Sequence, residues 1–211
     1  MTKTFIRAAT VAAALSLGVT ANARAATINL AADTANQEFD ILWVLAITNP
    51  NTTLRALGEF TASVTDTFID FSVTMTNQTP LASEQIHSFG FNVVQNVSSV
   101  TFGSGIAFSE AGVNQNFPTF QTIDVCVWTS NNCAGGAQGP NIDGNGGVGT
   151  ASFRLFGDFS NGATLNTFAI KFQGDPNSYE FEGNPPTGVP EPASVLLVGL
   201  GMATVLGRRR S

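Results

Sequence analysis

Apolar and polar side chains alternate strictly along residues 66–77, DTFIDFSVTMTN. Ile69, Phe71, Val73 and Met75 occupy every second position, and mainly Asp, Ser and Thr stand between them. Successive side chains of a β-strand point to opposite faces, so a period of two places these four residues on one face. The β-branched and aromatic residues of the run also favour a strand. The pattern predicts a half-buried β-strand.

Further runs of similar length are rich in apolar, β-branched or aromatic residues and are bounded by Gly, Asn, Asp or Pro. They cover Phe39–Thr48, His87–Val97, Ser99–Ser104, Gln121–Ser130, Thr150–Phe159 and Thr164–Gly174. Short strands at regular intervals with turn residues between them predict an all-β fold, an antiparallel β-sandwich of jelly-roll-like form. We expect most of the 17 phenylalanines to pack in its core.

The N-terminal segment has the three parts of a secretory signal peptide. Lys3 and Arg7 precede a short apolar stretch, Ala8–Val19, and Ala23 and Ala25 have the A-x-A spacing of a cleavage site. The alternative is an N-terminal amphipathic helix. We predict a signal helix over residues 1–25, removed by signal peptidase after Ala25 or, alternatively, after Ala23.

The body between the two terminal segments, residues 26–189, is strongly acidic. It holds three basic residues, Arg55, Arg154 and Lys171, against fourteen acidic ones, a formal net charge of −11. Such a surface is repelled by nucleic acid and by anionic lipid. We therefore expect no nucleic-acid partner, and the sequence predicts no cofactor.

Two cysteines, Cys126 and Cys133, are separated by six residues in CVWTSNNC. In an exported protein such a pair favours a disulfide, which would close an eight-residue loop. The chain-entropy model assigns this loop roughly 2–3 kcal/mol. A metal site is disfavoured, because the spacing is not C-x₂-C and no histidine lies near in the sequence.

The search for catalytic residues is mostly negative. His87 is the single histidine, and no G-x-S-x-G elbow accompanies it, so we interpret it as a polar residue at a strand edge. Two pairs of carboxylates have the spacing of one strand face, Asp66 with Asp70 and Glu180 with Glu182. A glycosidase needs two carboxyls flanking a sugar, but solvated face residues are the simpler interpretation.

Two features suggest ligands. Asn141, Asp143 and Asn145, followed by Gly146, match the first half of a calcium loop, but position 12 is Ser152 and the bidentate glutamate is missing. The alternative for this segment is an ordinary turn. Separately, Trp43 and Trp128 could stack on sugars. Trp43 lies in a nearly continuous apolar run that favours the core, whereas Trp128 is the more open candidate.

The chain ends in VPEPASVLLVGLGMATVLGRRRS, residues 189–211, after a Pro/Gly-rich linker at 181–188. The apolar span 193–207 would be about 22 Å long as a helix, short for a hydrocarbon core of about 30 Å. Arg208, Arg209 and Arg210 behind it should stay cytoplasmic. Its glycines, the absence of an amphipathic stripe and the terminal arginines argue against a core helix. We predict a single transmembrane helix that holds the precursor transiently.

This tail resembles the PEP-CTERM sorting signal of Gram-negative bacteria. The matching residues are Val189, Pro190, Glu191 and Pro192, the apolar span and the three arginines. The resemblance implies recognition by exosortase, with Pro190, Glu191 and Pro192 as recognition residues and the arginines as a positive stop. It also implies removal of the tail near the Pro-Glu-Pro and delivery from the inner membrane to the envelope surface or extracellular matrix. Hosts of the family typically make extracellular polysaccharide.

Three functions are compatible with these observations. The first is a non-enzymatic, exported surface or matrix protein associated with exopolysaccharide, with a sandwich ectodomain at residues 26–180. The second is a polysaccharide- or calcium-binding module, and the third is a secreted glycoside hydrolase. The sequence favours the first and does not identify a ligand.

Overall fold

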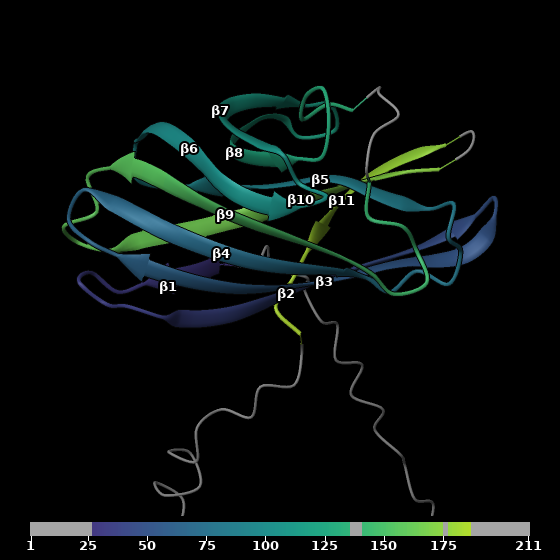
Figure 1. Ribbon diagram of the computed structural model, residues 1–211, viewed down its shortest axis with the longest axis horizontal. Coiled ribbons are helices and arrows are strands. Elements are labelled where there is room, and N and C mark those ends of the chain that lie inside the picture. The colour runs from purple at the N-terminus through teal and green to yellow at the C-terminus, as the bar shows by residue number, and fades with distance from the viewer. Residues whose placement is uncertain (1–26, 136–140, 175–176, 187–211) are drawn as a thin grey trace, which may run out of the picture.

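The computed structural model describes residues 27–135, 141–174 and 177–186. These residues form eleven β-strands and no helix (Figure 1). The strands are β1 (Thr27–Leu30), β2 (Gln37–Thr48), β3 (Asn51–Val64), β4 (Phe68–Asn77), β5 (Gln85–Val93), β6 (Val97–Ile106), β7 (Glu110–Phe117), β8 (Gln121–Trp128), β9 (Gly147–Gly157), β10 (Ala163–Gln173) and β11 (Ser178–Gly183). Within the described part of the chain, no helix is long and apolar enough to cross a membrane.

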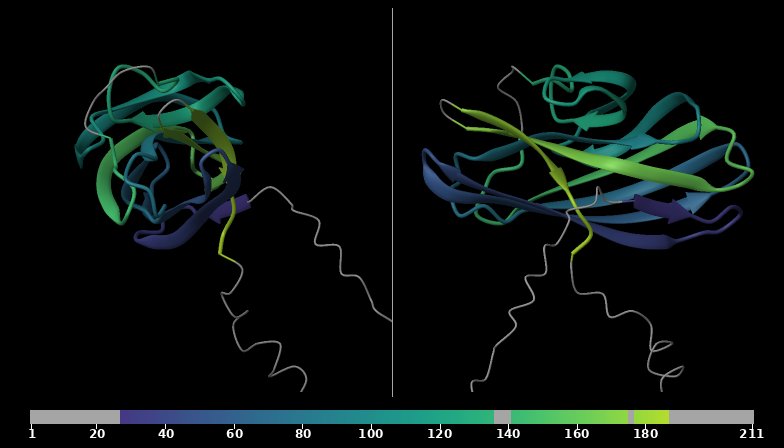
Figure 2. Two further views of the ribbon diagram at one scale, coloured as in Figure 1. Left: turned by 90° about the vertical axis from the view of Figure 1, so that its right-hand side faces the viewer. Right: turned by 180° about the vertical axis from the view of Figure 1, so that it is seen from behind.

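The strands form two antiparallel sheets that face each other as a sandwich, seen along its length in the left view of Figure 2. The first sheet has the order β1-β10-β5-β8-β7, and β11 also pairs with β10. The second sheet has the order β2-β3-β4-β9-β6. The predicted all-β antiparallel sandwich is confirmed.

The chain winds between the sheets in the manner of a jelly roll. β4 and β5 lie in different sheets, and they pair with β9 and β10, which also lie in different sheets. The two halves of the chain are thus wrapped together as antiparallel arms, the arrangement of a double-sheet jelly roll. The hairpin of β2 and β3 extends the second sheet at one edge.

The predicted alternation of β4 is confirmed in the core. Ile69, Phe71, Val73 and Met75 are at most 3% exposed. Phenylalanine rings from both sheets meet between the layers: the ring centroid of Phe71 in β4 lies 5.5 Å from that of Phe91 in β5, and Phe71 also stacks on Phe153 of its own sheet at 5.1 Å. Phe117 packs in a separate cluster beside the disulfide, and the large, fully buried rings of the main core are Trp43, Phe60, Phe89, Phe91, Phe159, Phe168 and Phe172. Burying one such side chain contributes about 1.5–3 kcal/mol, so this cluster is the main source of stability.

The sandwich extends beyond the predicted boundary at residue 180. β11 continues to Gly183, and Asn184 exchanges two backbone hydrogen bonds with Leu42 of β2. Two contacts explain this difference: Phe181 stacks on Phe172 with centroids 5.7 Å apart, and β11 satisfies the backbone groups of residues 168–173 at the edge of β10. Residues 181–184 of the predicted linker therefore belong to the fold.

The predicted signal helix (residues 1–25) and the predicted membrane helix (residues 193–207) lie outside the described residues.

Candidate functional site: the open face of the second sheet

The face of the second sheet that points away from the core, here called the open face, is rich in hydroxyl and charged groups. It carries Glu38, Asp40, Thr61, Glu59, Asp70, Ser72, Thr74, Thr150, Ser152, Arg154, Thr101 and Ser104. All of these side chains are exposed or half-buried. The same period of two that buries the apolar half of β4 brings this polar half to the surface.

Strand register aligns these groups in rows across the sheet. One row runs from Thr61 through Ser72 and Ser152 to Ser104. Ser104 Oγ lies 3.1 Å from Ser152 Oγ, and the Ser104 backbone N–H donates to that same Ser152 oxygen at 3.1 Å. Four strands thus contribute hydroxyl groups to one line on a rigid surface.

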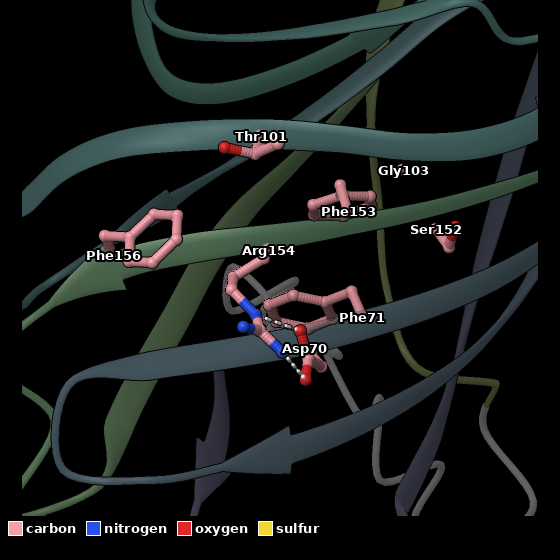
Figure 3. A pocket seen from close by; sticks show the side chains of 8 residues that line it. All are labelled: Asp70, Phe71, Thr101, Gly103, Ser152, Phe153, Arg154 and Phe156. Carbon is pink, nitrogen blue, oxygen red and sulfur yellow. Dashed lines mark hydrogen bonds and ion pairs between the residues drawn. The ribbon is translucent and has the colours of Figure 1, made fainter.

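The neighbouring row contains an ion pair between Asp70 of β4 and Arg154 of β9, which stand directly opposite each other. Arg154 Nε donates to Asp70 Oδ1 at 2.6 Å and Arg154 Nη2 donates to Asp70 Oδ2 at 2.7 Å (Figure 3). These hydrogen bonds raise the pKa of the Arg154 guanidinium above its usual value. The guanidinium carbon also lies 3.9 Å from the ring centroid of Phe68. The side chain is held in place by a two-point contact on one edge and a ring on one face.

This ion pair borders a groove of about 390 Å³. The groove crosses β4, β9 and β6 and is lined by Asp70, Phe71, Thr101, Gly103, Ser152, Phe153, Arg154 and Phe156. In Figure 3 the Asp70–Arg154 pair lies between β4 and β9, Phe156 extends from the same strand as Arg154, and Thr101 lies on the adjacent strand. Charged, hydroxyl and aromatic groups therefore meet at one hollow of the open face.

A second hollow of about 270 Å³ lies over β2, β3 and β4 on the same open face. Glu38, Asp40 and Glu59 line it together with hydroxyl-bearing residues. Asp40 stands directly opposite Glu59, a like-charge pair that is unfavourable across a sheet. This half of the open face is negatively charged, whereas the charges of the Asp70–Arg154 groove compensate each other.

His87 is not at a strand edge, as the sequence suggested, but fully buried in β5 between β10 and β8. Its Nδ1 lies 3.2 Å from Asn141 Oδ1 and 3.3 Å from Thr129 Oγ1, and its Nε2 lies 3.1 Å from the Asn132 carbonyl oxygen. Both ring nitrogens have polar protein partners, so this side chain serves the packing of the loop over β5.

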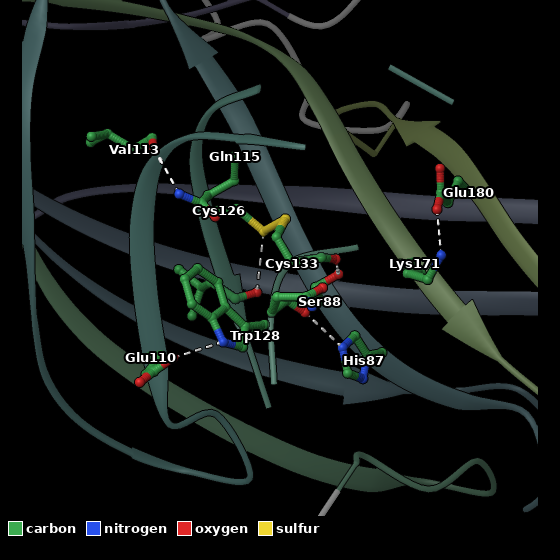
Figure 4. Close-up of a disulfide and its surroundings, with 12 residues drawn as sticks. His87, Ser88, Glu110, Val113, Gln115, Cys126, Trp128, Cys133, Lys171 and Glu180 are labelled. Carbon is green, nitrogen blue, oxygen red and sulfur yellow. Dashed lines mark hydrogen bonds and ion pairs between the residues drawn. A yellow bond between two sulfur atoms is a disulfide. The ribbon is translucent and has the colours of Figure 1, made fainter. Parts of the chain in front are cut away.

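The two tryptophans are buried, Trp43 completely and Trp128 to 7% exposure. Trp43 Nε1 donates to the Phe168 carbonyl oxygen at 2.9 Å, which links the two sheets. Trp128 Nε1 donates to Glu110 Oε2 at 3.0 Å (Figure 4). The core position predicted for Trp43 is confirmed, and Trp128 is not the open stacking surface that the sequence suggested.

The predicted disulfide between Cys126 and Cys133 is present, with Cα atoms 6.2 Å apart. Both cysteines are buried against the outer side of the first sheet, and Ser88 Oγ donates to the Cys133 carbonyl oxygen at 2.9 Å (Figure 4). The disulfide ties the segment after β8 back to β8, and the Ser88 hydrogen bond holds this segment against β5.

The calcium candidates are spread over a turn between the disulfide loop and β9. Asn141 Oδ1 accepts from Thr129 Oγ1 at 2.6 Å, and Asn141 Nδ2 donates to Gln85 Oε1 at 3.1 Å. Asp143 Oδ1 accepts from the Gln85 amide, and Asn145 is exposed with a φ of 63°. Among the described residues, no three His, Cys, Asp or Glu side chains are grouped so that they could hold a metal ion.

The carboxylate pairs proposed from spacing have unlike environments. Asp66 is exposed, while Asp70 is paired with Arg154. Glu180 is paired with Lys171, and Glu182 has a buried Oε1 that receives no hydrogen bond. The Asp70–Arg154 contact could not be predicted from sequence spacing. It joins residues 84 positions apart and follows only from the register of β4 with β9.

The sorting motif lies outside the described residues and is established by comparison. Residues 188–210 match the family model of the PEP-CTERM protein-sorting motif. The chain is therefore an exported β-sandwich protein with a C-terminal sorting signal. More specifically, it carries the PEP-CTERM motif, which implies processing by exosortase. No curated protein and no solved structure shows significant similarity to the chain.

Proposed function

We propose that this protein is a non-enzymatic component of the cell surface or extracellular matrix that associates with exopolysaccharide. Its sorting motif supports export and processing by exosortase. The proposed delivery route adds cleavage by signal peptidase at the N-terminus and a transient inner-membrane tether before exosortase acts. The observation that carries the association is the open face, where hydroxyl, carboxylate and guanidinium groups from five adjacent strands form one polar surface.

The architecture supports a durable extracellular role. A disulfide closes the loop after β8, and disulfides persist in oxidising, extracytoplasmic compartments. The jelly-roll winding places residues far apart in sequence on neighbouring strands, so the open face is presented by a rigid scaffold. A rigid polar sheet can form many weak hydrogen bonds with a polymer at little cost in conformational entropy.

Among the alternatives, a polysaccharide-binding module is favoured over a glycosidase. The groove beside Asp70 and Arg154 combines polar groups with a phenyl ring, as sugar recognition requires. A glycosidase requires two carboxyls that flank the scissile bond. Asp70 and Glu180 are each held by a basic side chain, an arrangement more typical of structure than of acid–base work.

The proposal is tested in the native host. Mass spectrometry of the envelope and secreted fractions should detect a form that lacks Arg208–Arg210 and begins near residue 26. The same form should sediment with purified exopolysaccharide of the host and remain in the supernatant without it. A protein that retains Arg208–Arg210 in every fraction would contradict cleavage. Failure to sediment with the polymer would remove the proposed association.

A further inference from the structure

We infer that the Asp70–Arg154 groove is a binding site for a neutral pyranose unit of a polysaccharide. This inference deepens the proposed function and rests on it. Three properties of the groove favour this ligand class: its hydrogen-bonding groups, its compensated charge and its aromatic ring.

The hydrogen-bonding groups suit a pair of adjacent sugar hydroxyls. A guanidinium has five N–H donors, and two of those on Arg154 are directed to Asp70. Within the described residues, Arg154 Nη1 donates to no protein group, because the two bonds to Asp70 come from Nε and Nη2. The Asp70 oxygens each accept one bond from Arg154 and keep further lone pairs. Donors and acceptors therefore stand side by side, and a sugar hydroxyl both donates and accepts.

The ion pair also sets the electrostatic character of the groove. Asp70 compensates the charge of Arg154 at hydrogen-bonding distance. Glu38, Asp40 and Glu59 in the adjacent hollow make the remainder of the open face negative. A uronate or a sulfated sugar would be repelled by these carboxylates and would find no uncompensated cation in the groove. A neutral sugar pays no such penalty.

Aromatic and hydroxyl side chains complete the site. Phe156 lines the groove and is half-buried, so part of its ring is available to the apolar C–H face of a pyranose. Thr101 and Ser152 line the same groove and bear hydroxyl groups. The volume of about 390 Å³ falls within the range of about 300–1,000 Å³ typical of small-ligand sites. The groove is large enough for one sugar unit, and it is open to the surface, so the rest of the polymer chain can extend beyond it.

The experiment uses the mature exported form purified from the host, in affinity electrophoresis through gels that contain a neutral polymer or an acidic one. The neutral polymers are mixed-linkage β-glucan, galactomannan and dextran, and the acidic polymer is alginate. We expect retardation by at least one neutral polymer and none by alginate. Arg154→Lys keeps the charge but loses the planar fork, and we expect it to weaken binding roughly tenfold or more. Phe156→Ala should do the same through loss of the ring.

Arg55→Lys is the matched control. Arg55 is exposed on the open face, and its Nε donates to Gln78 Oε1 at 2.6 Å, outside the groove. This variant should bind as the unmodified protein does. The Asp70→Asn variant tests the effect of charge compensation, because it leaves the positive charge of Arg154 without a carboxylate partner. We expect this variant to bind neutral polymers more weakly and to be retarded by alginate.

Each of the remaining outcomes would contradict one part of the inference. Retardation by alginate alone refutes the neutral class, and retardation by none of the polymers refutes a sugar site. If the Arg154→Lys, Phe156→Ala and unmodified proteins bind equally and have the same circular dichroism spectra, the groove is not the sugar-binding site. If the unmodified protein sediments with host exopolysaccharide while the groove variants do so equally well, the proposed function stands and this inference alone fails.

Discussion

Lys171 of β10 and Glu180 of β11 form an ion pair that is almost completely buried, with side-chain exposures of 6% and 5%. The two residues stand directly opposite each other across the strand pair. Glu180 Oε2 also accepts a hydrogen bond from the Thr119 backbone N–H at 2.6 Å. One carboxylate thus joins β10, β11 and the turn between β7 and β8. It is also one reason why β11 belongs to the sandwich rather than to a linker.

Removal of one partner of this pair should be strongly destabilising. Lys171→Met leaves a buried carboxylate without its cation, and we expect a loss of about 3–5 kcal/mol in the free energy of unfolding. Chemical denaturation followed by tryptophan fluorescence measures it. The double variant Lys171→Met, Glu180→Leu should recover most of the loss, because two apolar side chains replace the pair. A single variant that costs less than about 1 kcal/mol would show that the pair behaves like an exposed one.

The Cys126–Cys133 disulfide should contribute measurably to stability. The double variant Cys126→Ala, Cys133→Ala removes the eight-residue loop closure, and we expect a loss of about 2–3 kcal/mol. Thermal unfolding with and without a phosphine reductant provides an independent measure, and the reductant should have no effect on the double variant. Intact mass spectrometry after alkylation should find no free thiol in the unmodified protein. Alkylation of both cysteines in the native state would contradict the bond.

The alternation of apolar and polar residues predicted the strands that have one face in the core and the other face exposed to solvent. β4 is such a strand, and its alternating residues lie where the pattern placed them. The disulfide was equally predictable, because seven positions of chain confine the two sulfurs whatever the rest of the fold does. Both features involve residues close together in the sequence, so strand geometry or the short chain between them is sufficient to predict them.

Features that depend on long-range packing were not accessible in the same way. His87 lies in β5, where residues 86–91 are all buried, because the loop after β8 covers the side that faces away from the core. Nothing in the sequence indicates that this loop packs over β5. The groove likewise requires Asp70 and Arg154 to meet across the register of β4 and β9, and one sequence does not specify which strands become neighbours.

The buried Glu84 and the half-buried Glu182 should make stability depend on pH. Burial raises the pKa of Glu84 and of Glu182 above the ordinary value of 4.5. The folded protein therefore keeps these protons at pH values where the unfolded chain has released them. By linkage, the free energy of unfolding falls as the pH rises from about 4.5 through the raised values. The variants Glu84→Gln and Glu182→Gln should flatten this decline and gain stability relative to the unmodified protein near pH 7.

Melting temperatures between pH 4.5 and pH 8 measure the effect. The exposed Glu38→Gln is the matched control and should leave the profile unchanged. Asp158 acts in the opposite sense, because hydrogen bonds from Ser160 lower its pKa and its contribution is lost as the pH falls below the ordinary value of 3.8. The series therefore starts above that value. Parallel profiles for Glu84→Gln and the unmodified protein would contradict the role of this burial.

Gly58 should be intolerant of a single added methyl group because Trp43 occupies the adjacent space. A Cβ atom at position 58 would lie 2.9 Å from Trp43 Cζ3 and 2.8 Å from Phe60 Cε2. Both rings are in the packed core, so we expect Gly58→Ala to cost about 1–3 kcal/mol through overpacking. Trp43→Phe removes part of the obstruction, and the added cost of Gly58→Ala should therefore be smaller in that background. A double-mutant cycle by urea denaturation measures this coupling, and strictly additive losses would show that Trp43 does not cause the constraint.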